Sequence, residues 1–486
     1  MKKLSRYVKK ALEQGVITND LKKYVKANIR LEGRSIPIKL RLKGDWTDHL
    51  NTDQWSFRIK IQDESNFHGL KIFSIMNPET RGHMQEWFVH KLLEGEGVLT
   101  TRYDFISVII NGEKKGVYAI EEHFTQELLE SQGRQPGPIL KISEDAYWEV
   151  TSREKRDSLK YGHLLPMYDA CIITPFQKNI VLKSNDLRQQ FLEAQELLYK
   201  HKLVSHPVDC LLVLDKYAKF YALSDLCKIR HGLETHNQRW YYNSNEARLE
   251  PVAYDMCVSE LFGDEKRPAL FGFQEQHIVE IDDVRKQIPF SPFNSMALNE
   301  KYYEYITRFS KRTYLDSVLL NLKDDIKKRE ILLQQDDSSY TFNTDYYYHS
   351  SERMIAEHER FSEVKYRTPP LYTYQLFTIK DTVLDQPPFV YVSLNAYYNN
   401  VDSTLALENF YHSPIQIVGY IDTDKHTQVC DTIELAKYND NHSITWAKGI
   451  NKPAQLIFRV ESWDNLYYSE VIPWKHPASK DLDISK

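Results

Sequence analysis

HGLETHNQRWYYNSNEARLEPVAYD, residues 231–255, places an asparagine and an aspartate at the two ends of a predicted strand-turn-strand unit. WYYN and LEPVAYD are typical of short strands, and the polar turn from Asn243 to Glu246 joins them. Asn237 lies on the approach to the first strand, and Asp255 lies at the end of the second. Amide and carboxylate oxygens brought together at adjacent strand ends can hold Mg2+ against phosphates. We therefore predict a metal site at Asn237 and Asp255.

The composition is that of a folded protein without a marked charge bias. The chain has 486 residues, of which 42% are hydrophobic, so two or three domains with substantial cores are expected. Its 63 basic and 68 acidic residues give a formal net charge of -5 and are spread along the chain. This balance lacks the basic footprint of a nucleic-acid-binding protein. The 32 tyrosines suit a carbohydrate or peptide surface and equally a Tyr-rich core.

The 5 cysteines are widely separated, form no CxxC pair and are accompanied by no HExxH signature. Neither a structural zinc site nor a disulfide framework is therefore expected, and buried free thiols favour a reducing compartment. The N-terminal stretch MKKLSRYVKKALEQGV predicts a basic helix and lacks the apolar segment of a signal peptide. No run of about 18 apolar residues occurs, so we predict no transmembrane segment in this chain.

Residues 24–150 are predicted to form a β-rich lobe, preceded by a basic helix within residues 1–23. Alternating patterns indicate strands in VKANIRL, IPIKLRLKG, SFRIKIQ, YDFISVIIN and GVYAIEE. The Asn111-Gly112 pair between the last two is the strongest hairpin signal in the chain. One helix is predicted within ETRGHMQEWFVHKLLEGEG. Strands, a helix and a hairpin in this order predict an α+β fold.

Residues 151–335 are predicted to be mainly helical and include the two strands beside the predicted metal site. SNDLRQQFLEAQELLYKH and DCLLVLDKYAKFYALSDLCKIR have the apolar spacing of helices. The polar, Tyr-rich segment 336–371 is interpreted as a linker or an irregular cover. From residue 372 to residue 476, about seven short strands predict an immunoglobulin-like β-sandwich with a binding or packing role. Residues 477–486 are interpreted as a tail.

The order of these segments resembles the CotH kinase family, a divergent branch of the protein-kinase-like fold, over roughly residues 24–262. The strand RLKG, a polar gap, SFRIKI, an arginine-led helix and ISVIINGEKKGVYAIEEHF follow the order of the family's motifs. The resemblance implies a two-lobed kinase-like domain with ATP and Mg2+ as cofactors. Its motifs place the nucleotide-binding candidates at basic and acidic residues of these segments: Arg41, Lys43, Arg58, Lys60, Arg81, Glu121, Glu122 and Lys141.

The basic residues among these candidates have a physical role if ATP binds. A transferring phosphoryl group needs fixed positive charge, which a buried Lys or Arg held by a Glu can supply. Arg58, Lys60 and Lys141 are candidates for the cation, and Glu121 or Glu122 for the carboxylate. In the alternative interpretation, Arg58 and Lys60 are outward residues of an amphipathic strand.

The catalytic base departs from the pattern of the family. Kinases place a catalytic aspartate about five residues before the metal-binding asparagine, where it accepts the proton of the substrate hydroxyl. Gly232 occupies that position here. Glu234, Asp225 and His231 are the candidate bases nearby. Loss of the aspartate is also compatible with a pseudokinase that binds nucleotide without turnover.

We therefore predict a CotH-like, ATP- and Mg2+-dependent phosphotransferase that acts on a protein or glycan hydroxyl and docks its acceptor on the sandwich. The alternative is a non-catalytic, pseudokinase-like protein of surface or polysaccharide assembly. A hydrolase ranks third, because no GxSxG motif occurs. The family resemblance implies work at a bacterial envelope or spore surface, hence an extracytoplasmic site through an anchor outside this chain, whereas the unpaired cysteines favour the cytoplasm.

Overall fold

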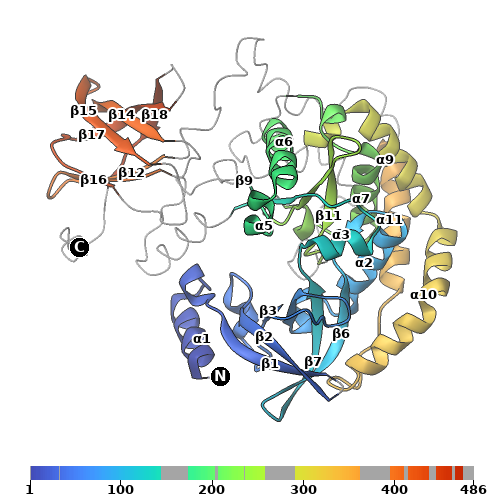
Figure 1. The fold of residues 1–486 in the computed structure, drawn as a ribbon. Helices are drawn as coiled ribbons and strands as arrows, with labels where there is room; N and C mark the ends of the chain where they lie inside the picture. Colours follow the sequence, from blue (N-terminus) through green and yellow to red (C-terminus); the bar gives the residue numbers. More distant parts are fainter. Residues whose placement is uncertain are drawn as a thin grey trace. The chain divides into compact units, whose positions relative to one another are not determined.

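The computed structural model divides the chain into two compact units (Figure 1). One comprises Met1–Lys141 and Ile173–Thr378, and the other comprises Ile142–Ile172 and Ile379–Lys486. The residues that the structure describes are 2–31, 33–143, 173–202, 206–234, 236–257, 291–361, 394–409, 414–436, 445–461 and 466–473.

The first unit contains a 6-stranded antiparallel sheet with the strand order β1-β2-β3-β4-β7-β6. The sequence predicts each of these strands except β4, whose short run IFSIM shows no alternation. The bounds are β1 Val25–Leu31, β2 Arg34–Leu42, β3 Phe57–Ile61, β4 Ile72–Met76, β6 Tyr103–Ile110 and β7 Glu113–Glu122.

The turn between β6 and β7 confirms the predicted hairpin. Ile110 pairs with Glu113, so Asn111 and Gly112 alone connect the strands. Their φ angles are +52° and +88°. A two-residue type I′ turn requires positive φ at both central positions, which Asn-Gly supplies at low cost.

The predicted N-terminal basic helix forms as α1 (Lys2–Gln14) and covers one face of this sheet. Its apolar residues Leu4 and Val8 share a hydrophobic core with Ile59 and Ile61 of β3. Because side chains alternate along a strand, the residues between them point to the opposite face. One face of the sheet is thus a conventional apolar core.

A 5-stranded sheet in the same unit has the order β5-β11-β10-β8-β9. It includes the predicted strands WYYN and LEPVAYD, which pair antiparallel as β10 and β11. The 3-10 turn η3 (Pro78–Arg81) precedes helix α2 (Met84–Gly95), which packs on β5 and β6. The strand bounds are β5 Leu99–Thr100, β8 Ile139–Ile142, β9 Ile173–Pro175, β10 Trp240–Asn243 and β11 Arg248–Ala253.

Helices make up most of the other described residues of the first unit. The predicted helices form as α6, where the Ser184 hydroxyl accepts the Leu187 N–H at 3.3 Å, and as α7. Helix α10 runs to the sheet, where Arg329 donates to Asp104 at 2.9 Å (Figure 1). The helix bounds are α3 Gln126–Ser131, α5 Lys178–Lys183, α6 Asn185–Lys202, α7 Leu214–Leu226, α9 Met296–Phe309, α10 Arg312–Leu333 and α11 Asp345–Phe361.

Helix α11 lies within the segment 336–371, where the sequence predicts a linker or an irregular cover. It packs on α7 and α9 and buries Tyr347 and Met354 completely. Ser350 and Ser351 are also buried on it. These small polar residues weaken the apolar periodicity, which is why the sequence pattern does not predict a helix here.

The second unit contains two 4-stranded sheets, in the orders β16-β13-β12-β19 and β15-β14-β17-β18. Apolar residues of both sheets form one core. The immunoglobulin-like topology stays a prediction, and residues 372–393 and 477–486 lie outside the described part of the chain. The bounds are β12 Leu394–Asn399, β13 Thr404–Asn409, β14 Ile415–Asp422, β15 Thr427–Leu435, β16 Thr445–Ala447, β17 Pro453–Val460, β18 Tyr467–Glu470 and β19 Ile472–Pro473.

The predicted α+β class is confirmed at the level of a mixed fold with several sheets and helices. The two-lobed kinase-like arrangement stays a prediction. None of the helices in the described ranges combines the length and the hydropathy needed to cross a bilayer.

Candidate functional site

The second face of the 6-stranded sheet carries charged side chains in one row. Arg41 of β2 pairs with Arg58 of β3, which pairs with Ser74 of β4, which pairs with Glu121 of β7. Directly paired residues point to the same face of a sheet. Arg58, Ser74 and Glu121 are buried, with 8%, 0% and 0% of their surface exposed. The interpretation of Arg58 as an outward, solvated residue is therefore wrong.

Lys43, which follows β2, forms a buried ion pair with Glu121. Its Nζ lies 2.9 Å from Oε2 of Glu121, and the two side chains are 6% and 1% exposed. Burial lowers the pKa of Lys43, and the Glu121 carboxylate offsets part of that effect. The Glu121 carboxylate thus holds the Lys43 ammonium group in a fixed position.

Arg58 has unused hydrogen-bonding capacity. Its Nε and Nη1 atoms are buried and have no partner among the described residues, and the same is true of the Ser74 hydroxyl and of Oε1 of Glu121. Burial lowers the pKa of Arg58, and the neighbouring Arg41 lowers it further. A buried polar group without a partner costs about 1–3 kcal/mol. A bound anion would satisfy the guanidinium and remove that cost.

The remaining charged candidates on the sheet and on β8 have separate surroundings. Glu122 is bound by Arg102 through contacts of 2.8 Å and 2.5 Å, so it is not the partner of Lys43. Lys60 is the exposed residue of β3. Lys141 on β8 is half-buried, with its Nζ 5.7 Å from the centre of the Phe176 ring.

Arg239 is a further cation that the sequence analysis does not identify. Its guanidinium carbon lies 4.8 Å from the ring centre of Tyr254 and 5.6 Å from those of Phe124 and Phe176. Two backbone carbonyls, of His236 and Gln238, accept from its Nη1 at 2.8 Å. The rings fix the direction of this guanidinium.

His123 shows that several of these cations converge. The residue follows β7, and its ring lies 5.3 Å from that of Phe176. Burial lowers its pKa well below the ordinary value for histidine, and surrounding positive charges lower it further. Those charges belong to Arg58, Arg41, Lys141 and Arg239. Cations from β2, β3, β8 and the approach to β10 therefore lie near enough to His123 to lower its pKa.

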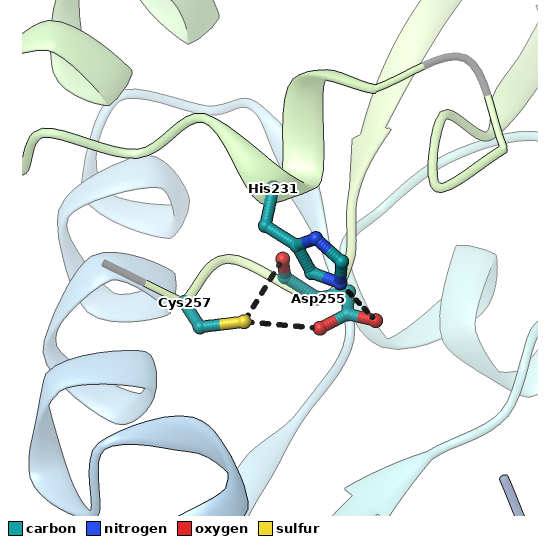
Figure 2. Close-up of side chains that lie close together, drawn as sticks. All are labelled: His231, Asp255 and Cys257. Carbon is teal, nitrogen blue, oxygen red and sulfur yellow. Dashed lines mark hydrogen bonds and ion pairs between the residues drawn. The ribbon is translucent and has the colours of Figure 1, made fainter. Parts of the chain in front are cut away.

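Asp255, just beyond β11, is the acidic centre of the site (Figure 2). Its Oδ2 lies 2.9 Å from Nη2 of Arg81 and 3.5 Å from Nε2 of His231. Its Oδ1 accepts the Cys257 S–H at 3.2 Å. Burial alone would raise the pKa of Asp255, but Arg81, His231 and Lys43 hold it well below the usual range. Asp255 is thus a buried carboxylate that stays ionised.

The backbone at Asp255 is itself unusual, with φ at +56°. A left-handed conformation at a residue other than glycine costs free energy and persists only where the surroundings enforce it. Glu86 of α2 supplies one such restraint, because its Oε1 accepts the Met256 N–H at 2.9 Å and lies 3.0 Å from Nε2 of His90. Helix α2 therefore fixes the segment that carries Asp255.

Gly232, in the position usual for a catalytic base, lies in the 3-10 turn η6 (His231–Leu233) and has no room for a side chain. A Cβ atom there would be 2.4 Å from Sδ of Met256 and 3.1 Å from the carbonyl oxygens of Tyr254 and Asp255. The glycine allows η6 to pack closely on the Asp255 segment.

The three candidate bases lie in two different environments. Asp225 is fully buried in α7, where Oδ1 accepts from Arg230 at 3.0 Å and Oδ2 accepts from the Tyr302 hydroxyl. His231 lies beside Asp255, and its Nδ1 is 3.9 Å from Oε2 of Glu234. Burial lowers the pKa of His231, whereas Asp255 and Glu234 raise it, and the net shift is upward.

Asn237 is also brought into this group. It is 5% exposed, and its Nδ2 donates to the backbone carbonyl of His231 at 2.9 Å. Within the described ranges, two groups of side chains have the geometry to hold a metal ion: His231, Asp255 and Cys257, and His231, Glu234 and His236.

Comparison with protein families agrees with the order of motifs. A family described as CotH kinase protein matches residues 40–278, which include Lys43, Glu121, Asn237 and Asp255. No curated protein matches the chain. The family indicates a kinase-like transferase and the use of a nucleotide and a metal. The chain carries a CotH kinase family domain over residues 40–278.

Proposed function

We propose that the protein is an ATP- and Mg2+-dependent phosphotransferase that acts on a protein or glycan hydroxyl. The observation that carries the proposal is the buried charged row in which Lys43 is paired with Glu121 and Arg58 keeps unused donors. A polyphosphate is the ligand that such fixed, partly unpaired cations fit best.

The basic residues bind and orient the phosphates in this proposal. Arg58 would donate from Nε and Nη1, the buried atoms that lack partners among the described residues. Lys43 would add a charge that Glu121 keeps in place. The ring centre of Phe124 lies 4.4 Å from that of Phe176 and 5.1 Å from that of Tyr254. These three rings offer apolar surface for the adenine base of ATP.

Asp255 and Asn237 would hold the metal. Both offer oxygen ligands of the kind that Mg2+ prefers. Oδ2 of Asp255 faces Arg81 and His231, whereas Oδ1 meets only the weak S–H donor of Cys257 among the contacts of the described residues. Asn237 uses its amide nitrogen on His231, which leaves its oxygen for the ion. Bound Mg2+ neutralises charge on the transferring group.

Glu234 is the preferred base. Its side chain is 52% exposed and can reach an incoming hydroxyl, whereas Asp225 is occupied with Arg230 and Tyr302. His231 is kept charged by Asp255 to higher pH than an ordinary histidine, which suits it to stabilise negative charge. The acceptor would dock on the two-sheet unit.

One observation favours the pseudokinase-like alternative. The space beside Gly232 is filled by Met256, so no side chain of the usual kind can approach from that position. A protein of this kind would bind nucleotide and act through its surface in envelope or polysaccharide assembly.

Calorimetric titration of ATP tests the proposal without knowledge of the acceptor. ATP is titrated into the wild type with Mg2+ and with EDTA, and into Asp255→Ala and Arg58→Met with Mg2+. We expect Mg2+-dependent binding that both variants lose. Lys26→Met, an exposed lysine on β1 of the same sheet, is the matched control and should bind as the wild type does.

Turnover separates the two candidate functions. Transfer of labelled γ-phosphate to the protein itself, or release of phosphate, would support the phosphotransferase if Glu234→Gln reduces it. Binding of Mg2+-ATP with neither activity would support the pseudokinase-like alternative. Absence of ATP binding by the wild type would reject both.

A further inference from the structure

We propose a second metal site, for a divalent transition metal such as Zn2+, formed by His231, Glu234 and His236. The three residues belong to η6 and the chain that follows it. The site uses other donor atoms than the oxygens proposed for Mg2+ and does not depend on nucleotide binding. With Zn2+ bound, His231 is neutral and Glu234 no longer serves as the base, so the two roles belong to the metal-bound and the metal-free protein.

The donor atoms are already close to coordinating geometry. Nδ1 of His236 lies 3.4 Å from Oε2 of Glu234, and Nδ1 of His231 lies 3.9 Å from the same oxygen. Ligand atoms of all three residues lie within 4.8 Å of one another. Adjacent ligands of a tetrahedral zinc ion are separated by roughly 3.3 Å, given metal-ligand distances of about 2.0–2.1 Å. Small side-chain rotations would therefore close the site.

The chemistry of the donors selects the class of metal. Two imidazole nitrogens and one carboxylate suit Zn2+ and other first-row divalent ions, whereas Mg2+ prefers oxygen ligands alone. The His231, Glu234 and His236 side chains are 24%, 52% and 21% exposed, so an ion can enter from solvent. Three protein ligands would leave a coordination position open.

Asp255 supplies the outer partner that a metal-binding histidine usually has. In Figure 2 one ring nitrogen of His231 points at Asp255 and the other points away from it. The first is Nε2, 3.5 Å from Oδ2 of Asp255, which leaves Nδ1 directed toward Glu234. A carboxylate on the far nitrogen orients the ring and makes it a stronger ligand.

Backbone hydrogen bonds hold the loop in the required shape. The Asn237 N–H donates to the Glu234 carbonyl at 2.8 Å, and the Asn237 side chain donates to the His231 carbonyl at 2.9 Å. These bonds tie Asn237, next to His236, back to both Glu234 and His231. The convergence of the ligands therefore comes from the fold of the backbone.

The other group, His231, Asp255 and Cys257, is a poorer site. Cys257 is fully buried, and its S–H donates to Asp255. Oδ2 of Asp255 is already taken up by Arg81 at 2.9 Å, so this group offers Zn2+ fewer usable donor atoms. His231 is shared by the two groups, and its Nδ1 favours the one with Glu234 and His236.

Zinc titration of the full chain tests the site. The protein is freed of metal with a chelator, and Zn2+ is titrated by calorimetry in excess Mg2+ without nucleotide. Co2+ serves as a spectroscopic probe of nitrogen ligation. The variants are His236→Ala, Glu234→Gln, Asp255→Asn and Cys257→Ser, and the matched control is His426→Ala, whose side chain is 74% exposed in the other unit. Thermal unfolding of the metal-free variants shows whether each is folded.

We expect a single tight Zn2+ equivalent that Mg2+ does not displace. His236→Ala and Glu234→Gln should each weaken it by at least about tenfold, and Asp255→Asn by about 10–100-fold through the outer shell. His426→Ala and Cys257→Ser should leave the affinity unchanged. Affinity unchanged in both His236→Ala and Glu234→Gln, or reduced only in Cys257→Ser, would overturn the proposal. Because Glu234 is largely exposed, Glu234→Gln keeps the test decisive if His236→Ala does not fold.

Discussion

The two faces of the 6-stranded sheet differ in whether their buried side chains use all of their bonding capacity. On β3, Phe57 and Ile59 belong to an apolar core that includes residues of α1. Arg58, between them in sequence, is buried on the opposite face with two donor atoms unused by the described residues. Buried residues thus have different roles on the two faces. One face supplies stability, and the other keeps binding capacity at some cost in stability.

The largest effect is expected where the charged face is internally paired. Glu121→Gln would leave Lys43 as a buried charge without its carboxylate, which should lower the free energy of unfolding by about 3–5 kcal/mol. Urea denaturation measures the loss. The double variant Lys43→Met, Glu121→Gln should recover most of it. A loss below about 1 kcal/mol in Glu121→Gln would show that the stability of the charged face does not depend on the Lys43–Glu121 pair.

The next prediction sets adjacent residues of β3 against each other. Ile59→Ala should lower the free energy of unfolding by about 2–5 kcal/mol because it leaves a cavity in the core. Arg58→Met should leave stability unchanged or raise it, because a desolvated cation is replaced by an apolar side chain, while ATP affinity falls. Equal destabilisation by the two substitutions would mean that Arg58 is a structural residue and would remove the contrast between the faces.

The charged face continues from Lys43 to Asp255 and His231, whose charges interact. A smaller effect is therefore expected on the pH dependence of stability. The pKa of His231 is raised above its unfolded value of about 6.5. Its contribution to stability is therefore complete below about pH 6.5 and is lost as pH rises through the folded pKa. In Asp255→Asn, burial should dominate and the pKa of His231 should fall. NMR titration of the histidine signals measures the pKa of His231 in the wild type and in Asp255→Asn. An unchanged pKa in the variant would contradict the pairing of His231 with Asp255.

The smallest effect is expected at the hairpin end of the sheet, away from the charged row. Gly112→Ala places a side chain at φ +88° and should lower the free energy of unfolding by about 1 kcal/mol. Glu113→Ala, on an exposed neighbour, is the control. Denaturant titration checks the difference. A larger loss, with weaker nucleotide binding, would show that the hairpin supports the charged face as well.

Local features of the fold could be predicted from the sequence. Alternation predicts most strands of the sheet, and Asn111-Gly112 predicts the turn, because both depend on a few neighbouring residues. β4 has no alternation because all but one of its residues are buried. The buried serines of α11 hide its helical period for a related reason.

The candidate site could be predicted only in part. The motif order points to Asn237, Asp255 and Lys43, but the partner of Lys43 depends on a contact 78 residues away in sequence. The sequence allows Arg58, Lys60 or Lys141 as the partner of Glu121 or Glu122. In the fold, Lys43 contacts Glu121, and Arg102 contacts Glu122.

Two further features of the site depend on distant parts of the chain. Tyr302, which occupies Asp225, comes from a helix 77 residues later. Arg239 and His123 carry no motif of their own. Their roles follow from cations and rings that only the folded chain brings together.

The close packing of Gly232 has an evolutionary consequence. Replacing Gly232 with Asp would force a side chain against Met256, whereas shortening Met256 alone would leave a void beside the loop. Each single step is unfavourable, so we expect the two positions to change together. Relatives with Asp at the position of Gly232 should therefore carry a small residue at the position of Met256, and pairs that break this rule should be rare among folded members of the family.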